Sequence, residues 1–163
     1  MMKAVVLVLS LSVLPLVSVA CPLGPKEDHL TISRIMRNFG KGFDKAETVA
    51  RKASDPWDAA NDNDFKAGIE GLNMAISCAA AVLANPTGEL LPSKLMLMTD
   101  EAQKKELTDA YIYFMEDFKE GLTEYRDLLT QNLAKKPEER DFAAIIHMNE
   151  QMNKRINKAH KSL

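Results

Sequence analysis

The stretch that decides the fold is residues 32–50, ISRIMRNFGKGFDKAETVA. Its apolar side chains recur every three or four residues, at Ile32, Met36, Phe39, Phe43, Ala46 and Ala50. This spacing places them along one side of an α-helix, because a helix turns once in about 3.6 residues. We therefore predict an amphipathic helix over residues 28–54. It ends before Pro56, since a residue that precedes proline disfavours helical backbone angles.

Three further segments show the same periodicity. Residues 65–84 follow a polar linker (55–64), and Asn63 or Asp64 is the expected N-cap. Residues 100–133 follow a long apolar connection, with Thr99 as the expected cap, and residues 138–161 form the last predicted helix. The apolar connection is expected to fold against the helices. The sequence thus predicts an all-α fold over residues 28–163, an antiparallel up-down-up-down four-helix bundle.

The first 20 residues have the pattern of a secretory signal peptide. Lys3 precedes an apolar run, and small residues stand before Cys21. The run is shorter than the roughly 20 residues that a membrane-spanning helix needs, so no membrane span is expected. Residues 21–27 are a linker, and the predicted location is the periplasm. Alternatively, residues 16–21 loosely resemble a bacterial lipobox, in which Cys21 would carry a lipid anchor.

The chain has two cysteines, Cys21 and Cys78. Cys78 lies among small residues in the second predicted helix, and we expect it to be a buried, inert thiol. An oxidising compartment also permits a Cys21–Cys78 disulfide.

Composition and motifs exclude several function classes. The formal net charge is −2, whereas nucleic-acid-binding proteins usually carry a basic face, so no nucleic-acid partner is expected. The sequence contains no G-x-G-x-x-G, P-loop, H-E-x-x-H or G-x-S-x-G motif. Cys-x-x-Cys is absent as well, which excludes a cysteine zinc site or a thioredoxin-type redox pair. We predict that the protein is not an enzyme.

Two residues at one end of the predicted bundle have ligand chemistry. At about 100° per residue, His160 falls on the same side of its helix as Ile156 and Met152, so it is expected to face the core. The start of the first helix and the end of the fourth share one end of an antiparallel bundle. Met36 and His160 are therefore expected to point inward together. A thioether and an imidazole form one of the axial pairs of electron-transfer haems.

These residues give the chain a resemblance to the soluble cytochrome b562 family of periplasmic four-helix bundles. The resemblance is carried by Ile32, Met36, Phe39 and Phe43, by Glu150-Gln151-Met152, Asn157 and His160, by Pro92-Ser93-Lys94-Leu95, and by Phe114. It implies one non-covalent haem b with Met36 and His160 as axial iron ligands. It also implies Phe39, Phe114 and Ile156 beside the haem, and an electron-transfer function with an unidentified redox partner.

The chain departs from the family pattern near the ligand histidine. The family has an arginine one turn before it, where this chain has Ile156, and Arg155 stands one position earlier. A partner for a haem propionate is therefore missing or moved. Related c-type cytochromes carry Cys-x-x-Cys-His here, but the corresponding places are Ile156 and Ala159, which rules out thioether attachment of the haem.

Four alternatives stay open from the sequence. His29 can replace Met36 as a ligand, which would give bis-histidine ligation. The chain can also be a haem-free periplasmic helical bundle that serves as a binding or scaffold protein. A third hypothesis is a copper or metal-sensing site at His147, Met148 and Met152. Finally, Trp57 either pins the 55–64 linker to the bundle or acts as a lid.

Overall fold

The computed structural model describes residues 20–23 and 29–162, and within them the chain is helical without strands. The helices are α1 (Ile32–Lys52), α2 (Pro56–Ala59), α3 (Asp62–Ala84), α4 (Ser93–Met96), α5 (Glu101–Leu133) and α6 (Phe142–Ser162). Single 3-10 turns lie at Gly88–Leu90 and Pro137–Glu139. The prediction of an all-α fold is confirmed for these residues. The predicted signal peptide (1–20), except Ala20, and most of the 21–27 linker lie outside them.

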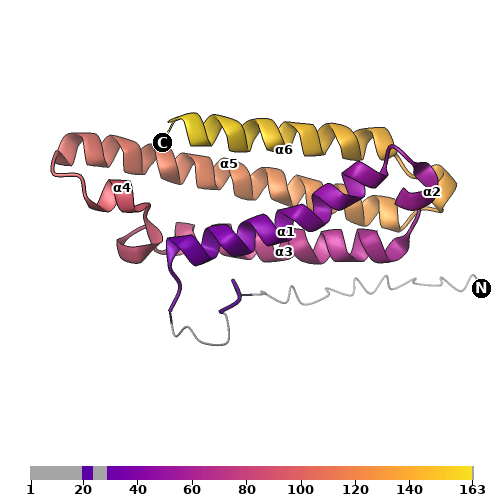
Figure 1. Cartoon of the computed structure of the whole chain (residues 1–163), viewed down its shortest axis with the longest axis horizontal. Helices are drawn as coiled ribbons and strands as arrows, with labels where there is room; N and C mark the ends of the chain where they lie inside the picture. Colours follow the sequence, from indigo (N-terminus) through magenta and orange to yellow (C-terminus); the bar gives the residue numbers. More distant parts are fainter. Residues whose placement is uncertain (1–19, 24–28, 163) are drawn as a thin grey trace, which may run out of the picture.

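The four long helices, α1, α3, α5 and α6, lie along the long axis of the molecule, and their chain direction alternates (Figure 1). Each packs against the next in the order α1, α3, α5, α6, and α6 also contacts α1. The contact between α1 and α3 is the most extensive of these, and that between α1 and α6 is the least. The start of α1 and the end of α6 lie at the same end of the molecule but apart from each other (Figure 1).

Two glycines allow α1 and α3 to pack closely. A Cβ atom on Gly42 would collide with the carbonyl group of Gly71, and a Cβ atom on Gly71 would collide with that of Gly42. Neither position has room for a side chain, so these two helices meet backbone to backbone. Gly42, which lowers helix propensity when α1 is considered alone, is therefore required by packing.

The core between the long helices contains two buried tyrosines with hydrogen-bonded hydroxyls. Tyr125 on α5 donates to the carbonyl oxygen of Ala46 on α1 at 3.1 Å. Tyr111 donates to the carbonyl oxygen of Leu90 at 3.4 Å, which ties α5 to the 85–98 connection. As expected from its apolar content, this connection packs on the core, where Leu90, Leu91 and Leu95 are buried.

The predicted free thiol at Cys78 is wrong, because Cys78 forms a disulfide with Cys21. The carbonyl oxygen of Pro22 also accepts hydrogen bonds from Asn38 at 2.8 Å and Arg34 at 3.3 Å. Residues 20–23 thus lie against both α1 and α3. A separation of 57 residues hides this pairing from sequence spacing. A sulfur atom that is engaged in a disulfide cannot carry a thioether-linked lipid, so lipidation of Cys21 is also wrong for this structure.

Several predicted helix starts are wrong by a few residues, and at α3 and α5 the reason is that a different polar side chain caps the helix. The side chain of Asn61, not that of Asn63 or Asp64, accepts a hydrogen bond from a backbone nitrogen in the first turn of α3. Asp100, not Thr99, caps α5. The last helix begins at Phe142 rather than residue 138, since Pro137–Glu139 form a separate 3-10 turn. The side chain of Asp141 then accepts a hydrogen bond from the backbone nitrogen of Ala144. The first helix begins at Ile32 rather than residue 28.

Within the described residues, α3 is the one helix that is long and apolar enough to cross a membrane by length and composition. The core helix of a soluble protein passes the same test, so this is weak evidence for a membrane span. Here α3 packs between α1 and α5, and its apolar residues Phe65, Leu72 and Val82 are fully buried.

Gly71→Ala is expected to lower the free energy of unfolding by about 1–3 kcal/mol, because the new methyl group forces α1 and α3 apart. The matched control is Gly40→Ala, where an added Cβ meets nothing within 4 Å. That variant is expected to be more stable than the wild type by about 0.5–1 kcal/mol, since alanine favours a helix interior. Urea denaturation measures both, and equal effects of the two variants would contradict the close packing.

Burial raises the pKa of Tyr111 from 10.0 to about 12. The folded state thus keeps this proton more tightly than the unfolded state does. The resulting stabilisation is complete below about pH 10 and is lost as the pH rises from 10 through 12. Tyr111→Phe is expected to make stability fall less steeply over this range in urea titrations. Tyr113→Phe, at a ring that is 62% exposed, is the control. An unchanged pH slope in Tyr111→Phe would refute the assignment.

Candidate functional site

Met36 lies in the second turn of α1 with 38% of its surface exposed. Phe39 marks the core direction of α1, because its ring packs on Phe118 of α5. Gly42, which contacts α3, lies about 60° to one side of Phe39, and Met36 lies about 60° to the other side. Met36 therefore stands on the edge of α1 that faces away from α3. The other long helix that contacts α1 is α6, and this contact is the least extensive among the four long helices.

His160 lies near the end of α6 and is exposed. Met152 is fully buried and marks the core direction of this helix. Arg155, about 60° to one side, faces α5, since its guanidinium donates to the Asp117 carbonyl oxygen at 3.0 Å. Ile156 and His160 lie about 40° and 80° to the opposite side. They therefore stand on the side of α6 that faces away from the Arg155–Asp117 contact with α5.

Three aromatic side chains of α1 and α5 are buried in the core. The rings of Phe39 and Phe118 have centroids 5.9 Å apart. Phe114, one turn before Phe118 on α5, is only 9% exposed. We call Phe39, Phe114 and Phe118 the aromatic floor. Ile156 is half-buried and packs against the same core.

The prediction that Met36 and His160 point into the core is wrong, because both side chains are exposed. The helical periodicity shows on which half of its helix each residue lies. It does not show how far that helix lies from the next one. At this end of the molecule the start of α1 and the end of α6 lie apart (Figure 1), and the aromatic floor forms the core.

His29 lies before α1 and is oriented by a different partner. Its Nε2 atom is 3.1 Å from a carboxylate oxygen of Glu89, and both side chains are largely exposed. Glu89 belongs to the 3-10 turn of the 85–98 connection. The contact orients His29 toward this connection.

Arg155 does not replace the family arginine that is absent at Ile156. Its guanidinium bonds to the Asp117 carbonyl and lies 3.3 Å from the Asp117 carboxylate. This contact joins α6 to α5 on the side away from His160. Any propionate partner at the Met36–His160 edges must therefore come from another residue.

The donor set at these edges fits a haem. Within the described part of the chain, no group of three or more His, Cys, Asp or Glu residues can hold a metal ion. A haem needs only axial protein ligands, because the porphyrin supplies the equatorial nitrogens. Met36 and His160 have one thioether and one imidazole, both accessible from solvent. Phe39 and Phe114 are buried in the core, and Ile156 is half-buried.

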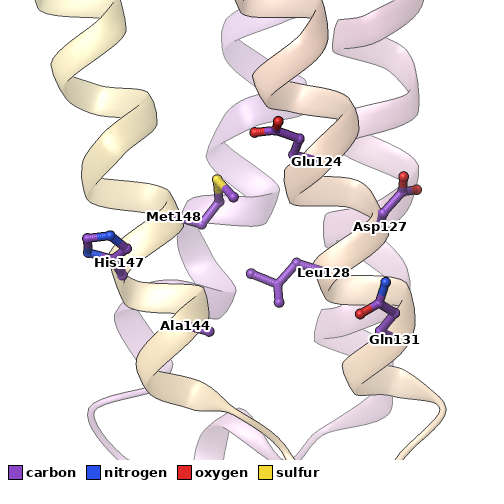
Figure 2. A pocket seen from close by; sticks show the side chains of 7 residues that line it. All are labelled: Glu124, Asp127, Leu128, Gln131, Ala144, His147 and Met148. Carbon is purple, nitrogen blue, oxygen red and sulfur yellow. The ribbon is translucent and has the colours of Figure 1, made fainter.

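A groove of about 490 Å³ lies on the other side of α6, against α5. The side chains of Met148 and Leu128 lie toward each other in it, while His147 lies on the outer side of α6 (Figure 2). His147 is 2.7 Å from the side chain of Gln151, and Met152 is fully buried beside Gly121. The structure therefore does not bring His147, Met148 and Met152 together as a metal site.

Phe118 is the site residue that the sequence interpretation missed. It follows Phe114 by one helical turn in the same apolar stripe, so the spacing contained the signal. The tertiary structure shows that the ring of Phe118 packs against that of Phe39 on α1.

Comparisons with family models, with curated proteins and with solved structures found no match for this chain.

Proposed function

We propose that this protein is a periplasmic electron-transfer protein that binds one haem b non-covalently between Met36 and His160. In the same proposal, the four long helices form an up-down-up-down bundle that is closed by the α1–α6 contact. The observation that supports the haem site is the position of two exposed ligand-type side chains, one near the start of α1 and one near the end of α6. Both stand at the same end of the molecule, beside the aromatic floor.

When bound, haem supplies iron that accepts or releases one electron. Met36 would hold the iron through its thioether and His160 through its imidazole. That arrangement suits an electron carrier and not an enzyme. A neutral imidazole and a soft thioether favour the ferrous state. Phe39, Phe114 and Ile156 exclude water and lower the local dielectric, which acts in the same direction.

Two features support export and a soluble partner. A disulfide such as Cys21–Cys78 is typical of oxidising compartments, including the periplasm. The net charge of −2 is compatible with weak, salt-sensitive docking to a basic redox partner.

Titration of the purified chain with haem is expected to give a sharp reduced Soret band with narrow α and β bands. Met36→Ala and His160→Ala are each expected to abolish this low-spin spectrum. Each also lowers haem affinity by at least about tenfold, or 1.4 kcal/mol, because one iron ligand is lost. Absorption spectroscopy measures both effects. Met148→Ala, a methionine in the α5–α6 groove, is the matched control and retains the wild-type spectrum.

A chain that binds no haem on titration would refute the proposal and favour the haem-free binding or scaffold protein. The near-infrared charge-transfer band of the ferric form distinguishes methionine–histidine from bis-histidine ligation. Loss of that band in Met36→Ala, with its retention in His29→Ala, is the expected pattern. The reverse pattern would assign the second ligand to His29.

A further inference from the structure

A second cavity lies at the opposite end of the molecule, where α1 leads into α2 and α5 leads into α6 (Figure 1). It measures about 670 Å³. Asp55, Trp57 and Ala60 line it from the α2 segment, and Pro137 and Glu138 line it from the segment before α6, together with Phe142 at the start of α6. The cavity is thus formed by two chain segments that are about 80 residues apart in sequence.

Arg140 joins these two segments and gives the cavity fixed walls. Its side chain is only 2% exposed. The guanidinium donates to the carbonyl oxygens of Asn132 at 3.1 Å and Ala60 at 2.8 Å, and to the carboxylate of Asp62. It also lies 4.6 Å above the centre of the Phe65 ring. All three guanidinium nitrogens are therefore engaged within the protein.

Asp62 compensates the positive charge of Arg140. The hydrogen bond from the guanidinium holds the pKa of Asp62 below its usual value, so this carboxylate stays ionised. The remaining ionic groups that line the cavity are the carboxylates of Asp55 and Glu138, both exposed. Lys135 and Lys136 precede the 3-10 turn but do not line the cavity. The rim of the cavity is consequently negatively charged, through Asp55 and Glu138.

Trp57 forms an exposed aromatic wall of this cavity. It is the only tryptophan in the chain, and 90% of its surface is accessible. It therefore neither pins the 55–64 segment to the core nor lies closed over it as a lid. The carboxylate of Asp55 accepts a hydrogen bond from the Trp57 backbone nitrogen at 3.1 Å, which keeps the two residues adjacent. An indole face beside two carboxylates attracts a cation that is also flat and apolar on its faces.

We propose that this cavity receives an arginine side chain from a basic segment of a partner protein. A guanidinium stacks on an indole ring and forms paired hydrogen bonds with a carboxylate, which the compact ammonium of lysine cannot do. Tryptophan and arginine are also the residues that most often dominate protein–protein interfaces. The site is independent of haem, because Met36 and His160 lie at the other end of the molecule.

Trp57 reports directly on the proposed site because its fluorescence is the only tryptophan signal of the chain. The probe is a hexa-arginine peptide, added to the full purified protein at low ionic strength. A saturable change in emission is expected, which weakens as salt is added. Hexa-citrulline, which has a similar shape but no charge, is expected to cause no change. Isothermal titration calorimetry gives the affinity independently of fluorescence.

Three substitutions test the recognition chemistry by calorimetry. Glu138→Gln and Asp55→Asn are each expected to weaken hexa-arginine binding by about two- to fivefold, as for exposed ion pairs. Asparagine at position 55 still caps α2, so the local fold is preserved. Trp57→Leu keeps an apolar surface but removes the indole, and a similar loss of about two- to fivefold is expected.

Glu124→Gln is the matched control, because it removes the same charge from the α5–α6 groove. It is expected to bind hexa-arginine as the wild type does. Equal weakening in Glu124→Gln and Glu138→Gln would show general charge attraction and overturn the proposal. Hexa-lysine that binds as tightly as hexa-arginine, or an unchanged Trp57 emission, would overturn it as well. Neither result bears on haem binding, which is measured separately by absorption.

Discussion

The backbone contact between Gly42 and Gly71 is the constraint on which the rest of the structure depends. It draws α1 onto α3, because no side chain separates the two helices. Between α5 and α6 the contact is of a different kind, because the side chains of Met152 and Arg155 occupy the space beside Gly121. Because α1 packs against α3 and α6 packs against α5, the contact between α1 and α6 is the least extensive of the four.

This unequal packing explains where the ligand-type residues lie. Met36 and His160 lie near the start of α1 and the end of α6, where these two helix ends lie apart (Figure 1). Both side chains are exposed, while Phe39, Phe114 and Phe118 are buried. At the opposite end, Arg140 performs a structural task by tying α2 and α3 to the segment before α6.

Much of the secondary structure was predictable from residue spacing. The ends of the second and third long helices, at Ala84 and Leu133, agree with the periodic pattern, since an apolar stripe stops where the core stops. The helix starts were less predictable. Residues 61–64 offer several capping side chains in succession, and the local sequence does not determine which one accepts the hydrogen bond. The disulfide was hidden for a related reason, because spacing along the chain does not show that residues 20–23 return to α3.

The sequence by itself determined the helical class, the apolar side of each long helix and the candidate ligands Met36 and His160. These follow from periodicity and side-chain chemistry, which are local properties. Only the tertiary structure decided that the candidate ligands Met36 and His160 are exposed and that Arg155 turns toward α5. It also decided that Trp57 and Arg140, from distant segments, line one cavity. Such features depend on how far apart two helices lie and which loops meet. Those distances are set by packing across the whole core, which no single segment encodes.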